Sequence, residues 1–242
     1  MQIGTKLRTG ERKSGQESQM SEQSPKRRGR PRAYDPEVAL ARATETFWEQ
    51  GYAGASLDDL SAATGMNRPS LYGAFGDKQA LFKATLERYM AESRAAMTEA
   101  FRGGGSLREV LTRIYRTALG FYLSGDAGGR GCFLASAGLG QAVIDQEVRQ
   151  TVADGMHELD RGIEGLLQRR QARGELPATV DPVALGRVAC MMMNGLSVRA
   201  RAGETREQLE ATILVMVDLI CGPSNSGSPN PGPPNPRPQA SE

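Results

Sequence analysis

The chain has 242 residues, of which 39% are hydrophobic, 24% are charged and 5% are aromatic, with a formal net charge of +2. Three widely spaced cysteines and the lack of an apolar run of about 20 residues exclude a disulfide-rich secreted protein and a membrane-spanning one. The first residues also lack the apolar core of a signal peptide, so we expect a cytoplasmic globular protein.

Charge is unevenly distributed along the chain. Residues 1–34 carry nine Lys or Arg and three Glu, a net charge of +6, which leaves −4 for the remainder. These residues show no hydrophobic period, and we expect a disordered basic arm. Residues 1–24 are expected to be a solvated tail, whereas the five cations within Lys26–Arg32 are expected to meet a polyanion. Residues 222–242 hold seven of the 13 prolines among Gly, Ser and Asn, which predicts a disordered tail.

Between these ends the sequence predicts helices throughout and no strands, so the expected fold class is all-α with about nine helices. Caps and apolar periodicity place the first seven over residues 36–51, 56–65, 67–75, 78–100, 107–123, 132–139 and 144–173. Asp181-Pro182 and Thr205 open the last two, and Gly222-Pro223 closes the chain of helices.

The second and third helices are the most informative pair. Each spans about two turns, and only Gly65-Met66-Asn67 separates them. Glycine suits the left-handed conformation that such a tight turn requires. Leu60 and Leu71 are spaced to pack against Phe47 of the first helix, together with Leu57 and Met66. A short turn that holds the third helix outward is the geometry of a helix-turn-helix motif, which enters the DNA major groove.

The run from Ala39 to Leu86 resembles the DNA-binding domain of the TetR/AcrR family of transcriptional repressors. The resemblance rests on Phe47-x-x-x-Gly51-Tyr52, Ser56-Leu-Asp-Asp-Leu60, Gly65-Met-Asn-Arg-Pro-Ser-Leu-Tyr72 and Phe75-Gly-Asp-Lys78. It implies a DNA-binding domain over residues 35–80 and a helical effector-binding and dimerisation domain over residues 81–221. It also implies a regulator rather than an enzyme, with no cofactor and no metal.

Several residues of this region have the chemistry to contact DNA. Ser56, at a helix N-terminus, can offer its hydroxyl and the adjoining amides to a phosphate. The resemblance gives Tyr72 and Lys78 phosphate contacts, and the less favoured alternative for Lys78 is an incidental surface lysine. Arg68 is the one long donor beside the small Gly73 and Ala74, and guanine is its expected partner. Three arginines of the arm are expected in an A·T-rich minor groove. The full candidate set is Arg28, Arg30, Arg32, Ser56, Asn67, Arg68, Pro69, Ser70, Tyr72 and Lys78.

The last two helices each carry a continuous apolar stripe, which predicts a four-helix interface between two copies of the chain. The stripes consist of Leu185, Val188, Ala189, Met192 and Leu196, and of Leu209, Ile213, Met216, Val217 and Ile220. The alternative is that they cover the core of their own subunit. A twofold dimer would read a palindromic operator.

Cys132 is the sharpest candidate for an effector or sensor residue. It follows Gly131 at the expected start of a short helix and lies two residues after Arg130. A helix N-terminus and a nearby cation both favour the thiolate form, although a free cysteine commonly fills core space. The segment around it also resembles a stretch in family members that sense electrophiles or oxidants. Cys190 and Cys221 lie in apolar stripes and are expected in the core.

Adaptable apolar side chains elsewhere predict a small-molecule pocket, with ordinary core packing as the alternative for each. The candidate lining residues are Phe121, Tyr122, Met156, His157, Met191 and Met193. His157 is the only histidine, and with such scattered cysteines it cannot form a zinc site.

The expected function is that of a homodimeric repressor, released from a palindromic operator by a small apolar molecule or a thiol-reactive inducer. The helix over residues 78–100, which joins the two domains, is the expected lever. The alternative is an architectural or activator DNA-binding protein without an inducer. An enzyme is disfavoured because the chain has no GxSxG elbow, no Walker loop and no GxGxxG after a strand.

Overall fold

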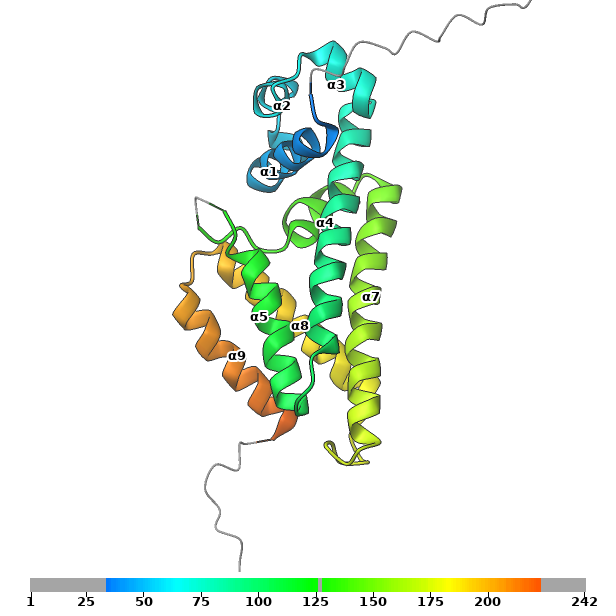
Figure 1. The fold of residues 1–242 in the computed structure, drawn as a ribbon, viewed down its shortest axis with the longest axis vertical. Coiled ribbons are helices and arrows are strands. Elements are labelled where there is room, and N and C mark those ends of the chain that lie inside the picture. Colours follow the sequence, from blue (N-terminus) through cyan, green and yellow to red (C-terminus); the bar gives the residue numbers. More distant parts are fainter. Residues whose placement is uncertain (1–33, 126–127, 223–242) are drawn as a thin grey trace, which may run out of the picture. The chain divides into compact units, whose positions relative to one another are not determined.

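The computed structural model describes residues 34–125 and 128–222, and within them the fold is all-α (Figure 1). The arm residues Arg28, Arg30 and Arg32, most of the arm and nearly all of the Pro-rich tail lie outside the described part. The helices are α1 Pro36–Gly54, α2 Leu57–Thr64, α3 Arg68–Phe75, α4 Lys78–Arg102, α5 Leu107–Tyr122, α6 Leu139–Ala142, α7 Gln146–Gln171, α8 Pro182–Arg201 and α9 Arg206–Cys221. A π-helical segment, η1 Leu134–Gly138, precedes α6.

The predicted capping residues begin the helices. Asp35, Asn67 and Asp77 each accept a hydrogen bond from a backbone N–H of the first turn of α1, α3 and α4. Ser56 and Ser106 form capping boxes with the carboxylate three residues later. Because a cap satisfies donors that the helix itself cannot, it fixes where each helix starts.

Two helical predictions need correction. Gly51 does interrupt the first helix, with φ 71°, but helical structure resumes and α1 extends to Gly54 across this kink. The short helix expected over residues 132–139 is instead the π-helical turn η1 followed by α6, which continues to Ala142. A π-helical turn has no distinctive sequence pattern, and such turns are frequent at functional sites.

Apolar side chains of α1, α2, α3 and the first half of α4 form one core with η1, α6 and the start of α7. Phe47 is fully buried against Phe82, and Leu60 and Leu71 complete the packing of the helix-turn-helix. Phe133, just before η1, packs against Phe82 and Trp48. The helix-turn-helix domain, formed by α1, α2, α3 and the start of α4 and here called the reading head, is therefore packed directly onto the segment that follows Cys132.

A second core joins α5, α8 and α9 with the later parts of α4 and α7. The long helices α4 and α7 lie side by side, and α8 packs along α7 (Figure 1). In residues 34–125 and 128–222, no helix is both long and apolar enough to cross a membrane.

Candidate DNA-reading surface and effector cavity

The turn between α2 and α3 places α3 on the surface of the reading head. Gly65 ends α2 in the left-handed conformation, with φ 69°, and Asn67 caps α3 by accepting from the Ser70 amide at 2.9 Å. Leu71 is the buried residue of α3. All the other predicted base- and phosphate-contacting residues of this helix are exposed, namely Asn67, Arg68, Pro69, Ser70 and Tyr72.

Arg68 is not a free donor on this surface. Its Nε and Nη2 lie 3.1 and 2.7 Å from the Asp58 Oδ1 of α2. Both side chains are more than half exposed, so solvent screens the pair and its net contribution is only about 0–1 kcal/mol. Arg68 could therefore leave Asp58 and bind the edge of a base at little cost in free energy.

Ser56 is similarly engaged. Its hydroxyl accepts from the Asp59 amide, and both its hydroxyl and its own amide donate to the Asp59 carboxylate. These bonds lower the pKa of Asp59 and keep it charged. A phosphate approaching Ser56 would meet that negative charge.

Lys78 and Tyr72 are better placed for phosphate. The Lys78 ammonium lies 4.5 Å from the ring centroid of Tyr52, and partial burial lowers the pKa of this lysine. No ion pair to Lys78 occurs in residues 34–125 and 128–222, so its charge is not neutralised by a carboxylate. Tyr72, within α3, is 44% exposed.

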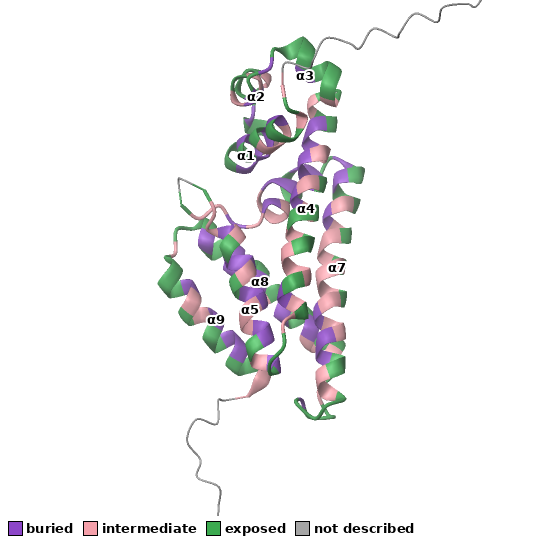
Figure 2. Ribbon diagram, in the orientation of Figure 1, coloured by how far each residue is buried: buried purple, intermediate pink, exposed green. Residues whose placement is uncertain are grey.

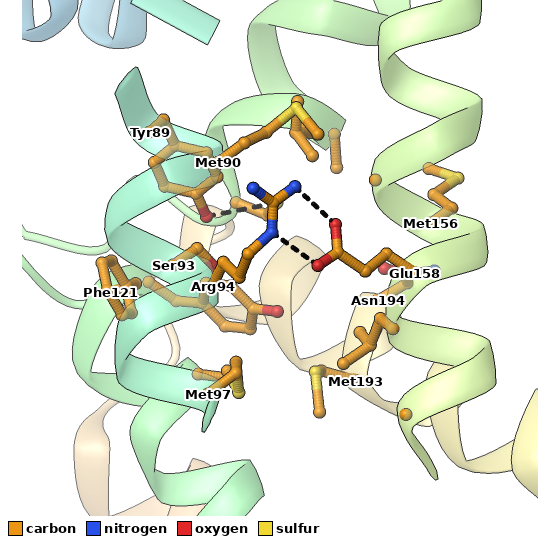
Figure 3. A pocket seen from close by; sticks show the side chains of 18 of the residues that line it. Tyr89, Met90, Ser93, Arg94, Met97, Phe121, Met156, Glu158, Met193 and Asn194 are labelled. Carbon is orange, nitrogen blue, oxygen red and sulfur yellow. Dashed lines mark hydrogen bonds and ion pairs between the residues drawn. The ribbon is translucent and has the colours of Figure 1, made fainter. Parts of the chain in front are cut away.

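The second candidate site is a cavity of about 310 Å³ between α4, α5, α7, α8 and η1 (Figure 3). Side chains of α4, among them Tyr89, Met90 and Met97, face Met156 of α7 across it. Of the predicted effector residues, five line the cavity: Phe121, Tyr122, Cys132, Met156 and Met193.

His157 and Met191 do not line the cavity, which corrects the prediction for both. His157 is exposed beside Met156 on α7, because neighbouring helical residues point about 100° apart. Met191 is 66% exposed on α8, two residues before Met193, which is 1% exposed. A run of three methionines carries no signal for which one faces inward.

The sequence reading missed the α4 wall of the cavity. Its residues are Tyr89, Met90, Ser93, Arg94, Met97, Thr98 and Phe101. They recur every three or four positions, the spacing of one helix face. That face alternates aromatic, sulfur and polar residues, so a search for a purely apolar stripe does not find it.

Arg94 and Glu158 are the charged members of the lining and pair with each other across the cavity (Figure 3). The Arg94 Nε and Nη2 lie 2.6 and 2.7 Å from the two oxygens of Glu158. This forked bond raises the pKa of Arg94 and lowers that of Glu158, so both stay ionised.

Cys132 lies between the cavity and α8. Its thiol accepts a hydrogen bond from the Tyr89 hydroxyl at 3.4 Å, and its amide donates to the Ser197 hydroxyl at 2.8 Å. The Arg130 guanidinium, expected to act on this thiol, instead pairs with Glu45 of α1 and lies over the Trp48 ring at 3.8 Å. The sequence spacing placed this cation near Cys132, but its side chain turns toward α1.

The segment from Gly128 to Phe133, here called the strap, joins the cavity to the reading head. The indole N–H of Trp48 donates to the Gly131 carbonyl at 3.2 Å. A Cβ at Gly131 would lie 2.7 Å from the Ser197 carbonyl oxygen of α8, and its φ is 70°. The strap is thus fixed to α1 on one side and α8 on the other, immediately before Cys132.

The apolar stripes expected to form the dimer interface mostly belong to the protein's own core. The buried members are Ala189, Leu196, Leu209, Ile213, Met216, Val217 and Ile220. The same helices carry a second, exposed apolar set, here called the outer apolar set. Its members are Val188, Met191, Val198, Leu214, Val215 and Leu219, each 43–71% exposed. Along α9, exposed and buried stretches alternate (Figure 2). Helical period alone does not say which of two stripes faces inward.

Comparisons with known proteins agree with this architecture. The family model described as "Bacterial regulatory proteins, tetR family" matches residues 39–85, and "Tetracyclin repressor-like, C-terminal domain" matches residues 110–216. The HTH-type transcriptional repressor ComR of Escherichia coli K12 is 33% identical over 76% of this chain and 88% of its own length. The HTH-type transcriptional repressor BdcR of the same strain is 29% identical over 76% of this chain and 88% of its own length.

A solved structure of the TetR family transcriptional regulator CifR, a cysteine mutant in complex with 26-base-pair operator DNA, is 34% identical with a TM-score of 0.71. The match covers 78% of this chain and 98% of CifR. These matches span the reading head and the cavity-bearing helices alike. The chain therefore belongs to the TetR family of DNA-binding transcriptional regulators, which are not enzymes.

Proposed function

We propose that the protein is a homodimeric repressor that leaves a palindromic operator when a small molecule occupies the cavity or a thiol-reactive compound modifies Cys132. The observation that carries this proposal is the strap, because it links Cys132 at the cavity wall to Trp48 of the reading head. The names of ComR and BdcR, both repressors, support the direction of regulation.

On the DNA side, the exposed face of α3 enters the major groove. Tyr72 and Lys78 bind phosphates, and Arg68 exchanges Asp58 for a guanine. Asn67, Pro69 and Ser70 line the same face. Ser56, at its edge, contacts a phosphate by exchanging its bonds to the Asp59 carboxylate. The arginines of the arm, Arg28, Arg30 and Arg32, bind the minor groove and add salt-dependent affinity.

The dimer forms through the outer apolar set of α8 and α9. A set of six exposed apolar side chains on two adjacent helices is an unfavourable surface to leave in water. Packing against a twofold-related copy would bury it and set the spacing of the two reading heads. That spacing must match two half-sites about one DNA turn, roughly 34 Å, apart.

Release is a population shift between two spacings of the heads. A ligand or modification lowers operator occupancy if it favours the DNA-incompetent arrangement over the DNA-competent one. The size of the effect is set by the difference between its affinities for the two arrangements. Occupation of the cavity pushes on Cys132 and the strap, which is bonded to α1, and on α4, which continues into the reading head. The expected lever, α4, therefore acts together with the strap.

The test is binding of the purified protein to DNA from its own upstream region at fixed salt, with and without N-ethylmaleimide. Site-specific binding that modification abolishes in the natural protein and spares in Cys132→Ser supports a thiol-responsive repressor. Loss of binding with a small molecule but not with modification supports a purely ligand-responsive one. Equal affinity for unrelated DNA overturns the proposal, because phosphate contacts alone carry no sequence information.

A further inference from the structure

The cavity has an interior without net charge. Among residues 34–125 and 128–222, Arg94 and Glu158 are the only charged lining residues, and they satisfy each other through two hydrogen bonds. Their side chains are 55% and 42% exposed, so the pair lies at the open side of the cavity. A charged ligand against the inner, apolar wall would find no counter-ion there, because Arg94 and Glu158 lie at the open side and compensate each other.

The lining also contains a buried hydroxyl without a partner among the described residues, whereas the polar lining residues Ser93 and Asn194 are more exposed. Tyr122 is 5% exposed and lines the cavity, and its hydroxyl makes no hydrogen bond to residues 34–125 or 128–222. The fully enclosed, unpartnered side-chain polar atoms in that part of the chain are the hydroxyls of Ser61 and Ser136. The Tyr122 hydroxyl is not among them, so it opens onto the cavity.

The hydroxyl of Tyr122 remains a neutral donor. Burial raises its pKa well above the ordinary value, and the neighbouring Cys132 adds to this shift. The other buried phenol at the cavity, Tyr89, already donates to the Cys132 sulfur. Tyr122 is therefore the buried donor still available to a ligand, and an unpaired buried hydroxyl gains most from an oxygen acceptor.

The rest of the wall suits an apolar body of variable shape. Met90, Met97, Met156 and Met193 line it, and methionine side chains adapt to irregular partners because they are unbranched and polarisable. A volume of about 310 Å³ is at the lower end of small-molecule sites.

We propose that the cavity binds an uncharged, largely apolar small molecule whose single oxygen, a carbonyl or hydroxyl, accepts a hydrogen bond from Tyr122. This inference rests on the proposed function only in taking the cavity as the effector site. It names the ligand class and the residue that selects it. Non-covalent binding of this kind needs no reaction at Cys132.

The experiment uses three probes of equal chain length on the full-length protein: 2-octanone, octanoate and octylammonium. Isothermal titration calorimetry should show 2-octanone binding at least about tenfold more tightly than either charged probe. Because this series uses the natural protein, its outcome does not depend on whether a variant folds correctly. Tighter binding of octanoate or octylammonium, or no binding of 2-octanone, overturns the proposal.

A variant pair then tests the residue. Tyr122→Phe should weaken 2-octanone about tenfold and leave propylbenzene, which has no oxygen, unchanged. Tyr115→Phe is the matched control, because the Tyr115 hydroxyl donates to the Ala189 carbonyl at 3.0 Å and does not line the cavity. Its affinity for 2-octanone should equal that of the natural protein. Equal weakening of both probes by Tyr122→Phe would overturn the hydrogen-bonding role.

The two proposals fail in distinguishable ways. Operator binding by the unliganded protein tests the proposed function and does not involve Tyr122. If the protein binds its operator specifically but prefers a charged probe, the ligand class is wrong and the repressor proposal stands. If 2-octanone binds as expected but the protein does not discriminate between DNA sequences, the reverse holds.

Discussion

Replacement of Trp48 by Phe should loosen the contact between the reading head and the strap. The change removes the indole N–H that donates to the buried Gly131 carbonyl at 3.2 Å, and keeps an aromatic ring against Tyr89 and Phe133. It also weakens the stacking of Arg130, whose side chain is only 13% exposed, because phenyl is a poorer partner than indole.

The expected loss in free energy of unfolding is about 2 kcal/mol. Leaving a buried carbonyl unpaired costs about 1–3 kcal/mol. A cation–π contact at a partly buried site contributes about 0.5–2 kcal/mol, of which a phenyl ring retains part. For a folded region of this size, about 2–4 °C of Tm is lost per kcal/mol, so Tm should fall by about 4–8 °C.

Differential scanning calorimetry measures the stability, and operator titration with and without inducer measures the coupling. Tyr115→Phe is the control, because it removes a buried hydroxyl–carbonyl bond of similar kind inside the second core. It should lower Tm by a comparable amount without altering inducer-driven release. If Trp48→Phe melts with the natural protein, the bond does not hold the strap. If both variants release DNA alike, the strap does not transmit the signal.

Three further predictions concern the DNA contact, the dimer and the thiol. Lys78→Met should weaken operator binding about tenfold and reduce the slope of log affinity against log salt by about one, whereas Lys83→Met, whose ammonium pairs with Glu147 in the natural protein, should leave the slope unchanged. Met191→Glu should convert the proposed dimer to monomer in analytical ultracentrifugation, because it places a charge in the outer apolar set. The exposed His157→Glu should remain dimeric, and a dimeric Met191→Glu would rule that surface out. N-ethylmaleimide should add once, at Cys132, as judged by peptide mass spectrometry, because burial raises the pKa of Cys190 and Cys221 and keeps them protonated. Preferential labelling of Cys190 would contradict this.

The helix starts were predictable because they are encoded locally. Asp35, Ser56, Asn67, Asp77 and Thr205 cap helices within three residues of their own position. The helix-turn-helix was predictable for the same reason, since Gly65 and its neighbours determine the turn by their own conformational preferences. These local preferences can be recognised in the sequence without knowledge of the rest of the fold.

The inward faces of α8 and α9 and the route of the strap were not predictable in this way. Met191 and Met193 are chemically identical, and only the packing of α7 and α5 against α8 decides which one is buried. The bond from Trp48 to Gly131 joins residues 83 positions apart, and Arg130 turned to Glu45 rather than to the nearby Cys132. Contacts at that separation depend on the assembled core rather than on local pattern.

Trp48 is the only tryptophan in the chain, and it lies where α1 meets the strap. The protein therefore contains a single tryptophan, which can be excited at wavelengths that its six tyrosines do not absorb, at the junction that the proposed signal must cross. Its indole is 4% exposed and has an arginine over its face, so its emission wavelength and quantum yield depend on how the strap is seated. Selective excitation of this tryptophan therefore reports the conformational change without a label. Its fluorescence can be followed in a stopped-flow instrument without contributions from other residues of the chain.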